Sequence, residues 1–124
     1  MNLVRIYAEF NRAKQQFSHV EMYKTSDGNV FVKAALQPSS QVYIVSIYFS
    51  EAYPNRMPHV YITKPTIEIA RHRYKEGHIC YLHPSMWNPG IHDLSFVIAR
   101  AAKWLSKHEI WKRRGVWPGA EIKH

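Results

Sequence analysis

The sequence predicts an α+β fold in which an N-terminal helix precedes a four-stranded antiparallel meander, a long irregular segment and a C-terminal helix. Apolar residues at three- and four-residue steps near both ends predict the helices, and β-branched and aromatic residues predict the strands between them. The connections between these strands are short, which favours antiparallel neighbours. A chain of 124 residues has the length of one domain, so we expect a single domain over residues 1–124.

The first predicted helix covers residues 3–17, and Asn2 before it is a suitable N-cap. Its apolar side chains form one stripe: Leu3, Ile6, Tyr7, Phe10, Ala13 and Phe17. Its polar side chains lie on another face: Arg5, Glu9, Arg12 and Gln16. We expect the apolar stripe to pack against the core and the polar face to lie away from it.

Four segments are predicted as the strands of the meander: residues 20–24, 30–36, 42–49 and 59–63. The first two are joined through Asp27 and Gly28, a pair typical of a hairpin turn. Residues 42–49 give the strongest strand pattern, because they combine β-branched and aromatic side chains without interruption.

Residues 64–88 show no regular period and contain prolines, a glycine and a charged run. A segment this long without secondary structure is uncommon in a compact domain and is usually functional, so we expect it to form the active-site loop. The second helix should begin after Asp93, its predicted N-cap, and end near Lys107. A separate helical turn is predicted over residues 109–113, closed by Gly115.

The chain is basic, with 17 lysine and arginine residues against 9 acidic residues and a net charge of +8. Such an excess suits an acidic partner or nucleic acid, but it also arises from a solvated basic surface. The densest basic run, residues 112–114, lies in no nucleic-acid-binding motif, and the aromatic residues are predicted to face the core. We therefore do not expect nucleic acid as the partner.

The chain has one cysteine, Cys80, which excludes an intramolecular disulfide. No secretory signal and no apolar stretch of membrane-spanning length are evident, so we expect a reducing, cytoplasmic location and no membrane partner. A lone cysteine is either a small buried hydrophobe or a reactive group. Polar, cationic and turn-forming neighbours favour an accessible thiol with a lowered pKa, and we adopt this second interpretation.

Three motifs occur in order along the chain: Tyr53-Pro54 with Met57-Pro58, Gly77-His78-Ile79-Cys80, and Trp87-Asn88-Pro89. With these motifs the chain resembles the ubiquitin-conjugating enzyme family over nearly its whole length. The resemblance implies the ubiquitin-conjugating enzyme-like fold and a transferase in which Cys80 is the catalytic cysteine. In such an enzyme the cysteine carries an acyl group as a thioester, without a metal or a cofactor.

The brief tail and the segment from Cys80 to Pro84 are similar to the bacterial branch of the family. In particular, the chain is similar to the stand-alone conjugating proteins of cyclic-oligonucleotide anti-phage (CBASS) systems. This resemblance implies a cGAS-like nucleotidyltransferase, joined through its C-terminal glycine, as the conjugated partner. The alternative partner is a ubiquitin-like protein of a bacterial modification operon, and an activating enzyme would serve either one.

The chain departs from the family at the His-Pro-Asn motif: eight residues before Cys80, where the asparagine is expected, it has His72. His72 is a candidate to donate to the oxyanion or to deprotonate the incoming amine, and otherwise a solvated loop residue. His83 is a second candidate, because a turn at Pro84 would fold its ring back to the sulfur. The alternative for His83 is a hydrogen bond that shapes the loop.

Other interpretations are open. Three cations near His72 either contact an acidic partner tail or are solvated: Arg71, Arg73 and Lys75. A catalytically inactive binding module would keep the fold, although such relatives typically lose the cysteine. A cysteine hydrolase would need a histidine held beside the thiol by a third group, and the sequence offers no such trio. The eight histidines show no metal-ligand spacing, so we expect no metal site.

Overall fold

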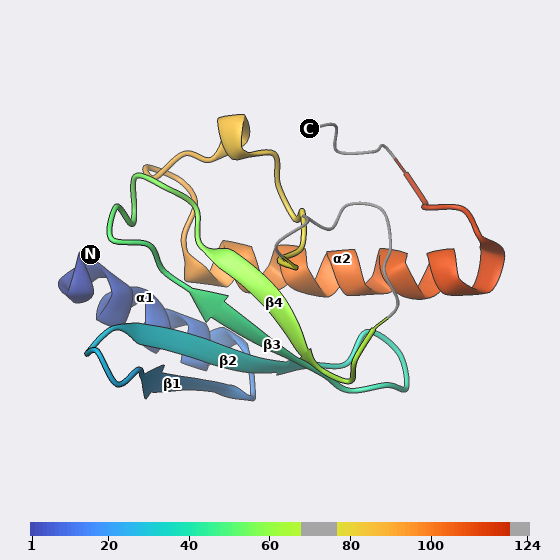
Figure 1. Ribbon diagram of the computed structural model, residues 1–124, viewed down its shortest axis with the longest axis horizontal. Helices are drawn as coiled ribbons and strands as arrows, with labels where there is room; N and C mark the ends of the chain where they lie inside the picture. The colour runs from blue at the N-terminus through green and yellow to red at the C-terminus, as the bar shows by residue number, and fades with distance from the viewer. Residues whose placement is uncertain (68–76, 120–124) are drawn as a thin grey trace.

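The computed structural model describes residues 1–67 and 77–119, and its elements follow the predicted order (Figure 1). They are α1 (Leu3–Gln16), β1 (Val20–Lys24), β2 (Val30–Leu36), β3 (Tyr43–Tyr48), β4 (His59–Lys64), the short 3-10 helix η1 (Pro84–Met86) and α2 (Leu94–Arg114). The α+β class and the four-stranded antiparallel sheet are therefore confirmed. Part of the predicted active-site loop, residues 68–76, lies outside the described residues.

The four strands pair in chain order, β1-β2-β3-β4, and each pair is antiparallel. Along β2 buried side chains alternate with half-buried ones, as expected for a sheet with one face on the core. Val32 pairs with Ile47, and Ile47 pairs with Val60, so a buried apolar row crosses three strands. The β1–β2 hairpin turns at Gly28, whose φ of 88° suits glycine.

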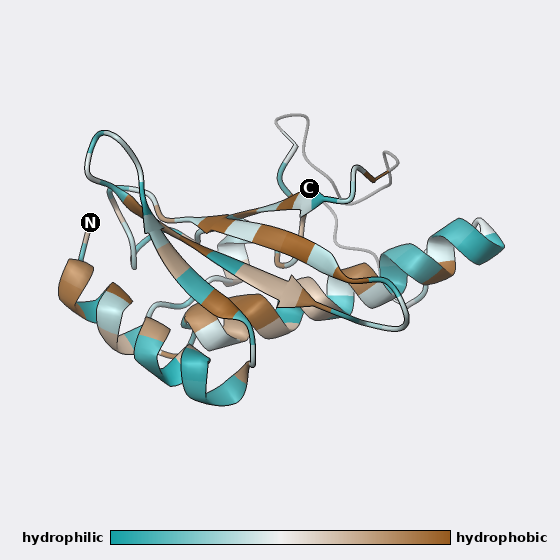
Figure 2. Ribbon diagram, turned by 90° about the horizontal axis from the view of Figure 1, so that it is seen from below, coloured by the Kyte–Doolittle hydropathy of each residue, from teal (hydrophilic) through white to brown (hydrophobic). Residues whose placement is uncertain are grey.

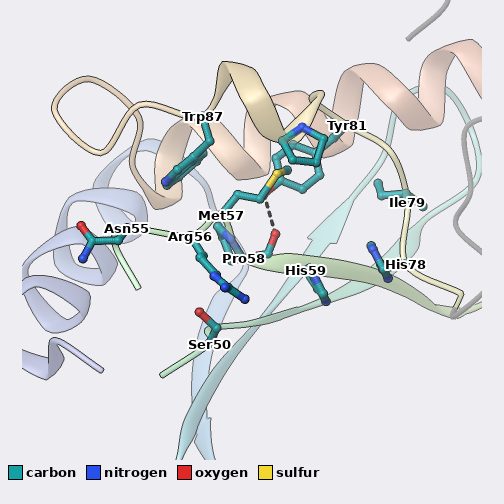
Figure 3. A pocket seen from close by; sticks show the side chains of 11 residues that line it. Ser50, Asn55, Arg56, Met57, Pro58, His59, His78, Ile79, Tyr81 and Trp87 are labelled. Carbon is teal, nitrogen blue, oxygen red and sulfur yellow. Dashed lines mark hydrogen bonds between the residues drawn. The ribbon is translucent and has the colours of Figure 1, made fainter. Parts of the chain in front are cut away.

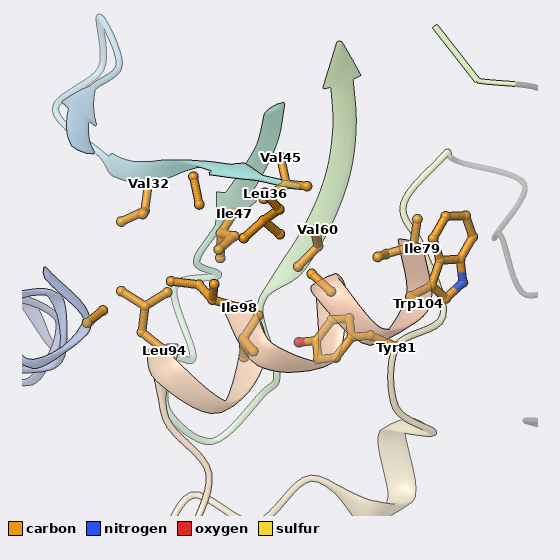
Figure 4. Packing of buried hydrophobic residues seen from close by; sticks show 14 of the residues in the cluster. Val32, Leu36, Val45, Ile47, Val60, Ile79, Tyr81, Leu94, Ile98 and Trp104 are labelled. Carbon is orange, nitrogen blue, oxygen red and sulfur yellow. The ribbon is translucent and has the colours of Figure 1, made fainter. Parts of the chain in front are cut away.

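Helices α1 and α2 cover one face of the sheet. Their apolar side chains pack against the buried apolar row of the strands and complete the core (Figure 4). Ile6 of α1 and Leu94 of α2 are both fully buried there. The predicted N-caps are confirmed, because the side chains of Asn2 and Asp93 accept hydrogen bonds from backbone N–H groups of the first turns. Neither α-helix of the described chain has both the length and the apolar character needed to cross a membrane.

Helix α2 is longer than predicted. It runs without a break to Arg114, whereas the sequence predicted an end near Lys107 and a separate turn. The physical reason lies in His108, which is fully buried, with its ring 5.2 Å from that of Trp104 and 5.5 Å from that of Trp111. This buried stripe continues the apolar face past Lys107. Gly115 closes the helix with a φ of 77°, as predicted.

The uncovered face of the sheet carries a row of aromatic side chains, so the prediction that the aromatic residues face the core holds for only part of them. Tyr23, Phe31 and Tyr48 follow one another on β1, β2 and β3, and Tyr23 and Tyr48 are exposed. Ring centroids are 5.5 Å apart for Tyr23 and Phe31, and 4.9 Å apart for Phe31 and Tyr48, in stacked geometry. Because the ring faces cover one another, the row is not an open platform for stacking bases.

Glu9 lies inside the molecule, although the sequence assigned it to the polar face of the first helix. Only 1% of its surface is exposed. Its carboxylate accepts hydrogen bonds from the Tyr53 hydroxyl, from the backbone N–H of Leu94 and from the Arg5 guanidinium. The burial of this charge is compensated by these three donors.

Candidate functional site

The segment that carries the cysteine begins at Gly77, where the chain turns with a φ of 101°. This left-handed conformation suits glycine and explains why the residue precedes the cysteine segment. Two residues later, the backbone N–H of Ile79 donates to the carbonyl oxygen of Val60 in β4, at 2.9 Å. The cysteine segment is therefore attached to the edge of the sheet one residue before Cys80.

Cys80 itself is buried, with 1% of its surface exposed. This corrects the expectation of an accessible thiol. Turn-forming and polar residues flank the segment, but residues 79–82 are themselves apolar and join the core as a group. The described structure thus holds the thiol beneath the surface, and a reaction at sulfur requires the segment to open.

Two aromatic residues fix the loop on either side of η1. The hydroxyl of Tyr81 donates to the carbonyl oxygen of Pro58 at 2.6 Å, and the indole N–H of Trp87 donates to that of Pro54 at 2.8 Å. Both acceptors belong to the connection between β3 and β4, which contains the cis Tyr53–Pro54 peptide bond. The motifs around Pro54, Cys80 and Trp87 are therefore brought together in space.

The cysteine segment is also attached to α2. Nε of Arg100 donates to the carbonyl oxygen of Tyr81 at 3.1 Å. The guanidinium group of Arg100 lies over the ring of Phe96, 5.8 Å from its centroid. Cys80 is thus flanked by a sheet contact at Ile79 and a helix contact at Tyr81.

A cavity of about 490 Å³ opens beside the cysteine segment (Figure 3). Apolar side chains form much of its wall: Met57, Pro58, Ile79, Tyr81, Pro84 and Trp87. The polar groups come from the β3–β4 connection, β4 and the cysteine segment: Ser50, Asn55, Arg56, His59 and His78. Cys80 does not line the cavity, but both of its chain neighbours do. An apolar wall with a few polar groups is the usual form of a ligand or peptide site.

His59 and His78 form one side of this cavity. Their rings stack with centroids 3.9 Å apart and planes 3° apart. His59 begins β4 and is exposed, whereas His78 is buried. The stack joins the start of the cysteine segment to the sheet.

His83 caps η1. Its Nδ1 accepts a hydrogen bond from the backbone N–H of Ser85 at 3.1 Å and lies 2.7 Å from the Ser85 hydroxyl. This contact matches the alternative in which His83 shapes the loop. Asn88 also has a local role, because its Oδ1 accepts from the N–H of Gly90 at 2.8 Å.

The other candidates of the sequence cannot be placed. His72 lies outside the described residues, and so do the three nearby cations Arg71, Arg73 and Lys75. Among the residues that are described, no three histidine, cysteine, aspartate or glutamate side chains form a metal-binding group.

The sequence reasoning missed Arg100 and His59. Neither residue is near Cys80 in the chain, and each reaches the site through tertiary structure. One signal was present for Arg100, since it begins a line of cations at helical spacing with Lys103 and Lys107.

This fold is shared with a solved structure described as "A complex of the Vps23 UEV with ubiquitin". The TM-score is 0.55, with 15% identity over 85% of this chain and 95% of that chain. At this identity the likeness shows the fold alone. Residues 9–124 match the sequence model of the family described as "Type II CBASS E2 protein", and the chain belongs to that family. No curated protein matches the chain significantly in sequence.

Proposed function

We propose that this E2-like CBASS protein is an acyl transferase that carries the C-terminus of a partner protein as a thioester on Cys80. The observation that carries the proposal is the position of Cys80 in a member of this family. The thiol follows the Gly77-His78-Ile79 motif, between the backbone contact to β4 and the Arg100 contact to α2. This arrangement gives the cysteine a fixed place next to a cavity.

The chemistry consists of two acyl transfers. The Cys80 thiolate attacks the carbonyl carbon of a C-terminal glycine that is already activated, for instance as a thioester on an activating enzyme. The new C–S bond forms, and the donor thiolate leaves. An acceptor amine then attacks the same carbon, the C–S bond to Cys80 breaks, and the amine gives up its proton to water or to a base. His72 is our candidate for that base or for an oxyanion donor.

Because Cys80 is buried, the proposal requires that the cysteine segment opens. Only 1% of the residue is exposed, so the donor must open the segment before sulfur can attack. The adjacent cavity supports a role for donor binding, because its apolar wall would receive the last side chains of an extended C-terminal peptide. Binding energy from these contacts would then favour the open state.

For the donor we propose a cGAS-like nucleotidyltransferase, because the family belongs to CBASS. A ubiquitin-like protein is the alternative donor. The catalytically inactive binding module is the alternative function, and the burial of Cys80 is the observation that favours it. Binding of the same C-terminal peptide without formation of a covalent adduct would distinguish this module from a transferase.

The test is a loading assay with a fluorescent peptide that ends in glycine and carries a C-terminal alkyl thioester. We expect an adduct on the native chain that survives a non-reducing gel and is removed by dithiothreitol. Cys80→Ala should form no adduct, and Cys80→Ser should form an ester that resists dithiothreitol. A synthetic peptide of residues 77–84 is the matched reference, since it presents the same thiol without the fold.

Two results would contradict the proposal. An adduct that persists in Cys80→Ala would place the acceptor elsewhere. A native chain that loads no faster than the reference peptide would show that the fold gives the thiol no catalytic advantage, and the transferase proposal would fail.

A further inference from the structure

One face of α2 carries a line of cations that starts beside the candidate nucleophile. Arg100, Lys103, Lys107 and Arg114 follow at steps of three, four and seven residues, so they share one side of the helix. We call these four residues the cationic stripe. At 1.5 Å per residue the stripe is about 21 Å long. The C-terminal end of α2 is mainly hydrophilic and extends past the sheet (Figure 2).

The near end of the stripe is fixed at the site. The hydrogen bond from Arg100 to the carbonyl oxygen of Tyr81 places the Arg100 guanidinium beside the residue that follows Cys80. The contact of Arg100 with the Phe96 ring also holds the group in place. The stripe therefore leads away from the point at which an acyl group would be attached.

The positive charges of the stripe are not neutralised by carboxylates of the described residues. The ion pairs among the described residues are those of the N-terminus with Glu51, Arg5 with Glu9, and Arg12 with Asp93. None of them includes a cation of the stripe. The single carboxylate within α2, Glu109, instead accepts hydrogen bonds from Ser39 and Tyr43 on the opposite side. Among residues 1–67 and 77–119 the stripe therefore has no partner of opposite charge.

The cations of the stripe also affect one another. Partial burial lowers the pKa of Lys107, and the positive charges of Lys103 and Arg100 lower it further. Lys103 and Arg114 are exposed to solvent. An anionic segment bound along the stripe would relieve this mutual repulsion.

We propose that the cationic stripe binds an acidic segment near the C-terminus of the protein that is loaded on Cys80. This inference rests on the proposed function and adds the chemistry of the donor. The stretch from Arg100 to Lys107 is about 10 Å long. An extended chain of three or four residues, at about 3.3 Å per residue, has that reach. Acidic side chains just upstream of the terminal glycine would therefore meet the stripe while the acyl carbon lies at sulfur.

The position of the stripe favours an acidic peptide over nucleic acid. A peptide joined to Cys80 through its own C-terminus is held at one end, so its charges would be at high local concentration along α2. Nucleic acid has no such anchor here. In the aromatic row on the sheet, Phe31 is stacked between Tyr23 and Tyr48, so the row is not a series of open ring faces for bases.

The test compares two fluorescent thioester peptides of equal length that end in glycine. One has three glutamates upstream of the glycine and the other has three glutamines. We expect the wild-type chain to load the acidic peptide about tenfold faster at low salt, with a smaller ratio at high salt. In Lys103→Gln/Lys107→Gln the ratio should fall towards one. The matched control is Lys112→Gln/Arg113→Gln, which removes the same charge from another face of α2 and should keep the ratio.

The outcomes separate this inference from the proposed function. If neither peptide loads, the proposed function fails, and the inference fails with it. If both load at equal rates on the wild type, the transferase stands and the inference is overturned. The inference is also overturned if the control variant lowers the ratio as much as the stripe variant does. A labelled single-stranded oligonucleotide tests nucleic acid as the occupant of the stripe. If it binds the wild type but not Lys103→Gln/Lys107→Gln, and the two peptides load equally, the inference is overturned.

Discussion

The hydroxyl of Tyr53 donates a hydrogen bond of 2.5 Å to Oε1 of Glu9 in the interior of the molecule. The same oxygen accepts from the backbone N–H of Leu94 at 2.8 Å, and the Arg5 guanidinium bonds the other carboxylate oxygen. One buried carboxylate thus joins α1, the end of the β3–β4 connection nearest β3, and the start of α2. These elements also support the segment that follows Cys80. Pro54, next to Tyr53, accepts the hydrogen bond from the Trp87 indole, and the connection after Trp87 leads into α2.

The first prediction concerns this carboxylate. Glu9→Ala leaves the buried Tyr53 hydroxyl and the Leu94 N–H without their acceptor, so we expect a loss of about 2–6 kcal/mol in the free energy of unfolding, at about 1–3 kcal/mol for each unsatisfied donor. Urea titration followed by circular dichroism measures this change. Glu21→Ala on the exposed side of β1 is the matched control and should stay within about 0.5 kcal/mol of the wild type. A Glu9 variant as stable as that control would refute the role of the network.

The second prediction is a loss of stability at alkaline pH. Burial raises the pKa of Tyr53, and so do its hydrogen bond to Glu9 and the negative charge there. Burial and the hydrogen bond to Glu109 raise the pKa of Tyr43 to about 12. A raised pKa in the folded state stabilises the fold below the ordinary tyrosine pKa of about 10, and this stabilisation is lost as pH rises through the folded value.

Unfolding free energies measured from pH 8 to pH 12 should therefore fall above about pH 10. Tyr43→Phe cannot ionise at that position, and its decline should be shallower than that of the wild type. Tyr23→Phe, at an exposed tyrosine, is the control and should keep the wild-type slope. Identical slopes in the wild type and Tyr43→Phe would rule out the coupling to Tyr43.

The elements of the fold could be predicted from the sequence because their signals are local. The helix caps Asn2 and Asp93, the Asp27-Gly28 turn and the alternation along β2 each depend on a few neighbouring residues. The end of α2 was misjudged because His108 is polar in the sequence. Its burial depends on two tryptophans that the helix brings around it.

The site was less predictable because its contacts join distant parts of the chain. Cys80 lies in the irregular segment between β4 and η1, and its burial depends on how residues 79–82 pack between β4 and α2. The acceptors of Tyr81 and Trp87 are carbonyl oxygens of Pro58 and Pro54, more than twenty residues earlier. No local sequence pattern indicates such partners, and none indicates that Glu9 is buried.

The third prediction concerns the reactivity of the thiol. Because Cys80 is buried, iodoacetamide should label the native chain at least about tenfold more slowly than the synthetic peptide of residues 77–84. Unfolding in urea should remove the difference. Intact-mass spectrometry follows both reactions. Native labelling as fast as the peptide would mean that the cysteine segment is open in the resting protein.

The fourth prediction concerns His83. Its Nδ1 caps η1 through the Ser85 N–H, and asparagine is also a good cap. If His83 only shapes the loop, His83→Ala should slow discharge of the Cys80 thioester to an amine, and His83→Asn should restore it. If His83 instead transfers a proton, discharge should be slow in both His83→Ala and His83→Asn. Single-turnover discharge of preformed thioester distinguishes the two roles, and we expect asparagine to rescue.

The last prediction returns to His72, which stands eight residues before Cys80 in the sequence, where the resemblance implies an asparagine. As an acid-base or oxyanion group it would act when the amine attacks, because charge develops on the carbonyl oxygen and the amine must lose a proton in that step. We therefore expect His72→Ala to slow discharge by about 10²-fold while loading changes much less. The variant should also lose the pH dependence of discharge near the histidine pKa of about 6.5, because no imidazole then titrates at that position. His19→Ala, a histidine at the start of β1, is the matched control and should discharge as the wild type does. Equal discharge rates and parallel pH profiles for His72→Ala and the wild type would move the role to His83, or leave Cys80 to work with backbone donors alone.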